Sequence, residues 1–322
     1  GKYPLKLKET IVYPIHKKDS KLNKENYRPV SVTNSLDKVI EEALLNQLND
    51  FFSKHEILDR YQYGFKKRRS CEDILSKVLS IVSNIIDKRR TSIMISLDLS
   101  KAFDTVNHKI LLAKLEHYGI RSKAYELLED FLNNRVQYVK VNNAISFIGH
   151  LKRGIPQGTQ KGPTLFSIYT NDMKELETHS RILKFADDTV LVFDIDPSQL
   201  EEASKQIHED ITLINEYYEN NRLTLNLKKA QALIFGNVPQ SLRTVLNDFK
   251  ITPVENMKYL GIMIDDKLNF QTALSTLRKS LNQAIGAAYV MRQTLTVKPL
   301  MDFYFGHFQS HVTYCNFFLI RL

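Results

Sequence analysis

The stretches "TSIMISLDLSKAFD" (residues 91–104) and "RILKFADDTVLVF" (residues 181–193) decide how this chain folds. The first opens with a short apolar run rich in β-branched residues, which predicts a buried strand with Asp98 at its end. The second reads as two apolar strands separated by acidic residues, which predicts a hairpin with Asp187 and Asp188 at or near its bend. Three carboxylates are therefore expected at the ends of buried strands.

These carboxylates point to metal-dependent chemistry. An ionised carboxylate beside a buried strand is costly unless it is paired or bound to a metal. If Asp98, Asp187 and Asp188 converge, they repel one another, and a divalent cation removes that penalty. Hard oxygen ligands suit Mg²⁺, and two such ions can activate an attacking oxygen and stabilise a leaving one in phosphoryl transfer. Because side chains alternate along a strand, Asp187 is expected to be the firmer ligand and Asp188 the supporting one.

Each acidic feature also has an ordinary structural interpretation. An Asp after a strand is common as a turn or cap residue, and two consecutive Asp residues often mark a solvated loop. A basic scaffold with purely structural carboxylates therefore stays open until the separation of Asp98 and Asp187 is known.

The composition is that of an ordinary globular protein. Of 322 residues, 43% are hydrophobic and 25% are charged, which suits two or three packed subdomains. We find no apolar run near the ~20 residues of a membrane span and expect no secretory signal in the opening residues. The two cysteines, Cys71 and Cys315, offer no zinc motif and favour free thiols. The net charge of +9 can attract a polyanion and make binding salt-dependent.

Strands and helices are mixed along the chain without strict βαβ alternation, which favours an α+β fold. Apolar residues at three- and four-residue steps predict an amphipathic helix over residues 36–52. Its apolar residues are Leu36, Val39, Ile40, Ala43, Leu44, Leu48, Phe51 and Phe52. The loop at 61–70 interleaves basic and aromatic residues, and the loop at 153–163 is punctuated by Pro and Gly.

The order of the motifs is more informative than any one of them. Along the chain they are "NYRPVSVTNSLDKVIE", "QYGFKKRRS", "SLDLSKAFDTVNH", "GIPQGTQKGPTLFSIYTND", "FADDTVLVF", "LTLNLKKAQALIFG" and "MKYLGIMIDD". This series closely resembles the reverse transcriptases of LINE-type, non-LTR retrotransposons, and among them the jockey-like group. The DxxxAFD, PQG and FADD blocks, in that order and spacing, are highly specific together. The related alternative is a group II intron or other bacterial reverse transcriptase. The stretches "NYRPVSV" and "DTVNHKIL" argue against it.

The resemblance implies a role for each matching residue of the catalytic blocks. Asp98 with the backbone carbonyl of Leu99, together with Asp187 and Asp188, would bind two Mg²⁺ ions, for which Mn²⁺ could substitute. Phe103 would be an aromatic steric gate, whose ring would collide with a ribose 2′-hydroxyl and so select deoxynucleotides. Its ordinary interpretation is a core aromatic residue.

Other matches concern the nucleotide and the nucleic acid. Gln157 would line the nucleotide pocket, and Gly158 would let the backbone approach closely. Lys66 would meet the incoming triphosphate, where many relatives have Arg, so the charge is kept and the bidentate fork is lost. Lys229 would also lie near the triphosphate. The residues expected to contact template or primer are Arg28, Lys67, Arg68, Arg69, Tyr259 and Gly261.

By resemblance the fold is a right-hand polymerase, in which a palm with a small antiparallel sheet lies between fingers and a helical thumb. One reverse transcriptase domain would comprise fingers at 1–90 and 136–160, palm at 91–135 and 161–245, and a partial thumb at 246–322. A shift in composition near the start of the last segment marks that boundary.

The implied activity is RNA-directed DNA polymerisation, in which a primer 3′-hydroxyl attacks the α-phosphate of a dNTP and pyrophosphate leaves. The partners would be an RNA template, a DNA primer and dNTPs, bound through phosphate contacts rather than base readout, without a membrane. Family habit places such enzymes in the nucleus and cytoplasm, and relatives carry an upstream nuclease domain that we do not expect in this sequence. The non-enzymatic alternative is a decayed or co-opted copy that binds RNA without polymerising.

Overall fold

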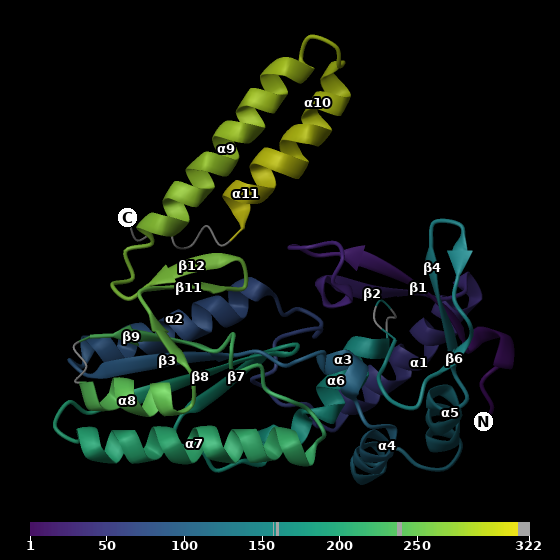
Figure 1. Ribbon diagram of the computed structural model, residues 1–322, viewed down its shortest axis with the longest axis horizontal. Coiled ribbons are helices and arrows are strands. Elements are labelled where there is room, and N and C mark those ends of the chain that lie inside the picture. Colours follow the sequence, from purple (N-terminus) through teal and green to yellow (C-terminus); the bar gives the residue numbers. More distant parts are fainter. Residues whose placement is uncertain (157, 159–160, 237–239, 315–322) are drawn as a thin grey trace.

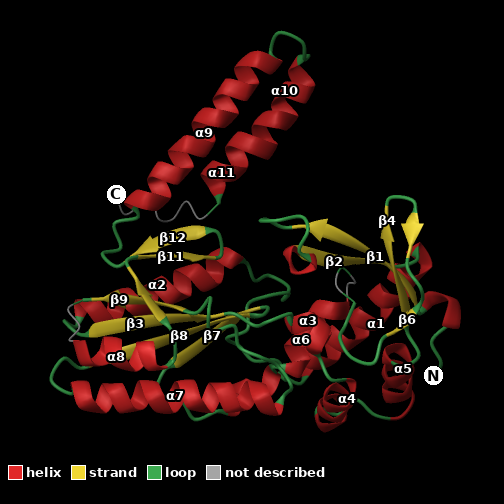
Figure 2. Ribbon diagram, viewed as in Figure 1, coloured by secondary structure: helices red, strands yellow, loops and turns green. Residues whose placement is uncertain are grey.

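The computed structural model describes residues 1–156, 158, 161–236 and 240–314. Figure 1 shows two lobes side by side, with a helical hairpin standing above one of them. Figure 2 shows that each lobe combines strands with helices, which agrees with the α+β class expected from the sequence.

The palm sheet is the central layer of the lobe below the helical hairpin. It has the strand order β10-β9-β3-β8-β7, and all its neighbouring strands are antiparallel except β10 and β9. Its strands are β3 (Thr91–Leu97), β7 (Arg181–Phe185), β8 (Asp188–Ile195), β9 (Gln231–Phe235) and β10 (Thr252–Val254). Because β10 belongs to it, the palm sheet continues past residue 245, where the thumb was expected to begin.

Helices cover both faces of the palm sheet, which explains why consecutive apolar residues of β3, β8 and β9 are buried. Alternate residues of β3 belong to different apolar clusters. Ile93 and Ile95 share a cluster with α7 (Leu200–Asn220), whereas Met94 shares one with α2 (Cys71–Asp87). Figure 1 shows α7 on one side of the sheet and α2 on the other. α2 lies inside the range expected for the fingers, but its buried side packs on the palm.

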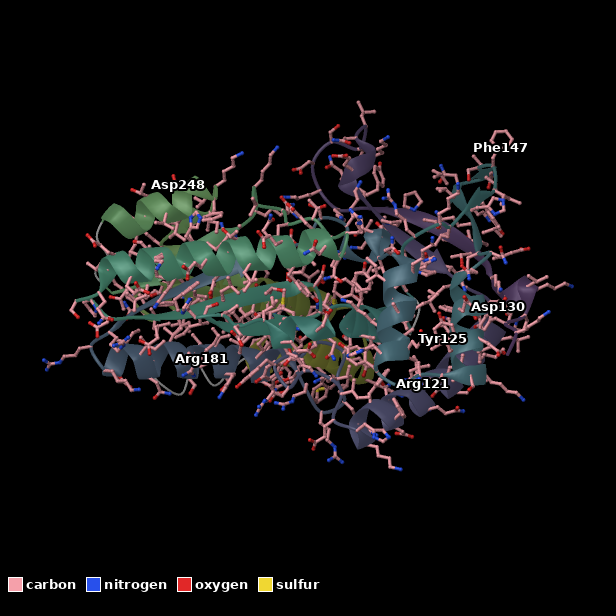
Figure 3. The ribbon with its side chains drawn as sticks, turned by 90° about the horizontal axis from the view of Figure 1, so that it is seen from below. Arg121, Tyr125, Asp130, Phe147, Arg181 and Asp248 are labelled. Carbon is pink, nitrogen blue, oxygen red and sulfur yellow. The ribbon has the colours of Figure 1, made fainter. Side chains whose placement is uncertain are left out.

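The second lobe contains the fingers sheet, with the strand order β2-β1-β4-β5 and β6 paired to β4. Its strands are β1 (Glu9–His16), β2 (Tyr27–Val32), β4 (Val136–Val141), β5 (Ala144–Ile145) and β6 (Gly149–His150). β1 pairs antiparallel with β2 and parallel with β4, so the start of the chain joins the segment after residue 135. Figure 3 shows Phe147 at the outer end of this lobe, where its side chain is fully exposed.

The remaining helices pack beneath and between the two sheets. They are α1 (Ser35–Lys54), α3 (Ala102–Thr105), α4 (His108–His117), α5 (Ser122–Leu132), α6 (Lys161–Tyr169) and α8 (Gln240–Asp248), with short 3-10 turns at Leu5–Leu7, Lys24–Asn26 and Asn171–Glu175. No helix in the described part of the chain is both long and apolar enough to cross a bilayer.

The segment expected to form the thumb contains a small hairpin followed by the helical hairpin. Its elements are β11 (Asn256–Tyr259), β12 (Ile262–Asp265), α9 (Gln271–Met291), α10 (Val297–Phe303), a π-helical turn (Tyr304–Gln309) and α11 (Ser310–Thr313). Of the α9 side chains, that of Ala284 is buried. These helices project away from the palm sheet (Figure 1).

The sequence-based prediction of which side of α1 is buried is wrong at the first turn of the helix. Leu36 and Val39 are 67% and 66% exposed, whereas the acidic Asp37 and Glu41 are fully buried. The buried side continues through Leu45, Leu48 and Phe52, so the helix is rotated relative to the expectation.

A buried arginine explains this rotation. The side chain of Arg135 is 1% exposed, and burial lowers its pKa while the charges of Asp37 and Glu41 raise it. The Tyr3 hydroxyl also donates to Asp37. Periodicity alone could not show that a cation from a distant part of the chain balances two acidic residues inside the fold.

Replacing Arg135 with leucine should leave Asp37 and Glu41 buried without their cation. We expect the free energy of unfolding to fall by about 3–5 kcal/mol, measured by urea titration at pH 7. Replacing the exposed Arg153 with leucine is the matched control, with an expected change within about 0.5 kcal/mol. Equal stabilities of the two variants would contradict the role of Arg135.

Candidate active site

The three carboxylates predicted from the sequence meet at one end of the palm sheet. The register of β3 and β8, continued one residue past the end of β3, places Asp98 opposite Asp188. The hairpin of β7 and β8 closes through the two-residue bend of Ala186 and Asp187. Asp187 thus lies in the bend, and Asp188 is the first residue of β8.

Burial and mutual repulsion raise the pKa of both hairpin carboxyls. Burial is the largest cause for Asp188, followed by the charges of Asp187 and Asp98, and its pKa rises to about 6. The pKa of Asp187 is also raised, mainly by burial and further by Asp98, while Arg28 and Lys229 lower it. The three carboxylates therefore share one electrostatic environment, in which a cation would favour their ionised forms.

Lys229 supplies a positive charge beside Asp98. Its Nζ lies 2.8 Å from Asp98 Oδ2. The Asn226 N–H donates to the Asp98 carbonyl at 2.8 Å, which fastens the "NLKK" segment to the end of β3. Among the described residues, no three acidic, histidine or cysteine side chains are already gathered as a metal-binding group. In this arrangement Asp98 is paired with Lys229.

The donor set at this end of the sheet nevertheless fits a divalent cation. Leu99 and Leu225 form an isolated bridge whose hydrogen bonds use the Asp98 carbonyl and the Ser100 N–H. The carbonyl of Leu99 takes no part in that bridge, so its oxygen would be available as a further ligand beside the carboxylates. Such hard oxygen ligands suit Mg²⁺.

The PQG loop is fastened to the segment after Asp98. Phe103 lies on α3, and its ring centroid is 4.8 Å from that of Phe166 on α6. The Phe103 carbonyl accepts from Ile155 N–H at 2.8 Å, and the Val106 carbonyl accepts from Gly154 N–H at 2.8 Å. The expected gate and the expected nucleotide loop are therefore neighbours.

The same loop also touches the fingers. Gly158 has a φ of +97°, and an added Cβ would lie 3.0 Å from the Ser31 carbonyl oxygen of β2. The close backbone approach expected at Gly158 is thus an approach to the fingers sheet. Gln157 lies outside the described residues.

The basic residues of the 61–70 loop divide into two groups. The ammonium group of Lys66 donates to the carbonyl oxygen of Asp59, and burial lowers its pKa to about 8. Lys67, Arg68 and Arg69 are exposed. Lys66 is therefore directed into the protein, whereas its basic neighbours are open to a polyanion.

The β11–β12 segment places its expected primer-binding residues differently. The Tyr259 ring is 2% exposed, and its pKa is raised mainly by burial and further by the nearby Asp188. Gly261 has a φ of +88° and lies under Tyr314, whose hydroxyl donates to the Leu260 carbonyl at 2.5 Å. The Tyr259 ring therefore belongs to the core, so the contact with primer expected here would have to come from the backbone of the turn.

Sequence reasoning missed Gln62, which lies buried behind the FADD bend. The available signal was a single amide residue between Tyr61 and Tyr63, in a loop that interleaves basic and aromatic residues. Propensity does not distinguish that arrangement from an ordinary surface glutamine.

Known proteins share this sequence pattern. The sequence model of the family described as "Reverse transcriptase (RNA-dependent DNA polymerase)" matches residues 15–264. The chain is 27% identical over 297 residues to the RNA-directed DNA polymerase from mobile element jockey of Drosophila melanogaster, covering 88% of this chain and 32% of that protein. It is 26% identical over 283 residues to the probable RNA-directed DNA polymerase from transposon BS of the same species, covering 83% and 30%. The chain thus spans about a third of the length of these relatives.

Solved structures share the fold. Telomerase from Candida tropicalis, in complex with the TWJ fragment of telomeric RNA, matches with a TM-score of 0.55 at 12% identity, covering 83% of this chain and 44% of that chain. The corresponding telomerase complex from Candida albicans matches with a TM-score of 0.52 at 13% identity, covering 98% and 56%. At such identities the likeness concerns the fold alone, and it confirms the right-hand polymerase architecture expected from the sequence.

Lys66 should make stability depend on pH in a defined direction. Its pKa falls from 10.5 to about 8 on folding, so between these values the folded chain holds fewer protons on this group than the unfolded chain. Stability contributed by this group therefore rises with pH in that window, and below it the cost of burying the charge is complete. We expect the stability of the wild type relative to Lys66→Met to increase from pH 8 to pH 10, measured by urea titration. The exposed Lys67→Met should show no such trend, and a flat Lys66→Met difference would contradict the lowered pKa.

Proposed function

This chain belongs to the reverse transcriptase family, and on that premise we propose that it is the polymerase core of a jockey-like, non-LTR retrotransposon enzyme. It would copy an RNA template by extending a DNA primer 3′-hydroxyl with dNTPs. The observation that carries this proposal is the meeting of Asp98, Asp187 and Asp188 at one end of the palm sheet. The family match extends over the segments that hold all three residues.

The carboxylates and the Leu99 carbonyl would hold two Mg²⁺ ions, or Mn²⁺ in their place. When bound, these ions would stabilise the negative charge that develops as the primer 3′-hydroxyl attacks the α-phosphate and pyrophosphate leaves. Asp187 and Asp188 are half-buried at this end of the sheet. Lys229 pairs with Asp98 and would turn toward the triphosphate oxygens when a nucleotide binds.

The fingers would bind the nucleic acid through its phosphates. Arg28 on β2 is exposed and is close enough to lower the pKa of Asp187. Lys67, Arg68 and Arg69 are exposed on the loop that packs against β7. Such charges favour an RNA template and a DNA primer without reading their bases. We further propose action in the nucleus and cytoplasm, and an upstream nuclease domain in the complete protein, as in the resembling family.

Replacing Asp187 with asparagine tests the polymerase activity. With a primer annealed to RNA, Mg²⁺ and dNTPs, we expect the wild type to extend the primer and Asp187→Asn to give background incorporation, because one metal ligand is weakened. Asp194→Asn is the matched control, since Asp194 lies on the same hairpin but is exposed and pairs with Arg90. Wild-type incorporation no higher than that of Asp187→Asn, with RNA still bound, would instead favour the decayed or co-opted RNA-binding protein.

Phe103 is proposed to select the sugar. Replacing it with valine removes the ring that would meet a ribose 2′-hydroxyl. We expect the ratio of kcat/KM for a ribonucleotide over the matching deoxynucleotide to rise by about tenfold or more. Phe305→Val, an exposed thumb aromatic, is the control with no expected change. Unchanged discrimination in Phe103→Val would reject the gate.

A further inference from the structure

The bend that presents Asp187 is held in an unfavourable backbone conformation. Ala186 is the first residue of the two-residue β7–β8 connection and has a φ of +58°. Two-residue connections with positive φ at this position ordinarily take glycine, because an L side chain is strained there. Strain of this kind persists only where the surrounding structure determines it.

The side chain of Gln62 forms hydrogen bonds with both the N–H and the carbonyl of this strained residue. Gln62 Oε1 accepts from Ala186 N–H at 3.0 Å, and Gln62 Nε2 donates to the Ala186 carbonyl at 3.1 Å. The same Oε1 accepts from Gly64 N–H at 2.8 Å. Two N–H donors point at Oε1, so the orientation of the amide is determined. With Gln62 3% exposed, no water competes readily for these bonds.

The backbone carrying Gln62 is itself fixed along β7. Gln62 forms a parallel bridge with Lys184, and Tyr63 N–H donates to the Lys184 carbonyl at 2.8 Å. A Cβ added to Gly64 would lie 2.2 Å from Ala186 N, so only glycine lets this segment lie directly against the bend. The Gln62 contacts that hold Ala186 therefore come from a segment distant in sequence from the carboxylates.

We propose that Gln62 is a positioning residue that fixes the FADD bend, and thereby the placement of Asp187 relative to Asp98. The inference rests on the proposed polymerase function, because its consequence is the geometry of the metal-binding carboxylates. Gln62 touches neither nucleotide nor metal in this role. Removing its amide lets the bend relax and moves Asp187, while the binding of dNTP is left to other residues.

The test compares Gln62→Leu with the wild type by two readouts. Removing the amide at nearly constant volume should lower kcat by about tenfold or more while KM for dNTP changes less than about twofold. In the metal-free protein, hydrogen–deuterium exchange at the Ala186 amide should accelerate by about tenfold or more. Gln62→Glu keeps the acceptor for both N–H groups, so the exchange protection should be largely retained.

Asn171→Leu is the matched control. Asn171 accepts from Asp59 N–H at 2.7 Å and donates to the Ile57 carbonyl at 2.9 Å, so it anchors the neighbouring part of the same loop without touching Ala186. We expect this variant to lower the melting temperature while leaving exchange at Ala186 and kcat near the wild-type values. Equal effects of Gln62→Leu and Asn171→Leu on both readouts would overturn the proposal.

A second substitution separates positioning from general stability. In an Ala186→Gly background the bend tolerates positive φ without strain, so Gln62→Leu should cost at most about threefold in kcat. The same loss in both backgrounds would overturn the proposal. If the wild type extends no primer, the proposed function fails, while exchange at Ala186 still decides whether Gln62 holds the bend.

Discussion

Carboxylates that share one end of a buried sheet need positive charge beside them. In this chain Asp98, Asp187 and Asp188 meet where β3 ends and the β7–β8 hairpin turns, and burial with mutual repulsion raises the pKa of Asp188 to about 6. Lys229 supplies part of that positive charge through its ion pair with Asp98. The repulsion and burial of Asp187 and Asp188 are not fully balanced by this lysine, and that is the physical reason why the site suits divalent cations.

The rest of the structure serves to place those charges. The palm sheet is covered on both faces, so its register is fixed and Asp98 cannot slip relative to Asp188. The PQG loop is fastened to α3, and the NLKK segment to the end of β3. The fingers come near enough for Arg28 to influence Asp187. Segments from distant parts of the chain therefore gather around the end of the palm sheet that holds the carboxylates.

Sequence reasoning succeeded where the pattern is local and failed where a partner is distant. The strand ending in Asp98 and the FADD hairpin follow from short apolar runs interrupted by acid, and the order of the motifs identifies the family. The buried side of α1 was misjudged because Asp37 and Glu41 are balanced by Arg135, which no periodicity reveals. Lys66 belongs to a basic run, yet a hydrogen bond to the Asp59 backbone turns it inward. Gln62 acts on a bend far along the chain, so only the folded structure could show it.

The most direct measurement of the central claim is Mn²⁺ binding by electron paramagnetic resonance, with primer, RNA template and a non-hydrolysable dNTP present. We expect two bound Mn²⁺ ions per wild-type chain, with the spin–spin coupling of neighbouring ions, and loss of that signal in Asp98→Asn. Wild-type binding no greater than that of Asp98→Asn would contradict the assignment of this sheet end as a two-metal site.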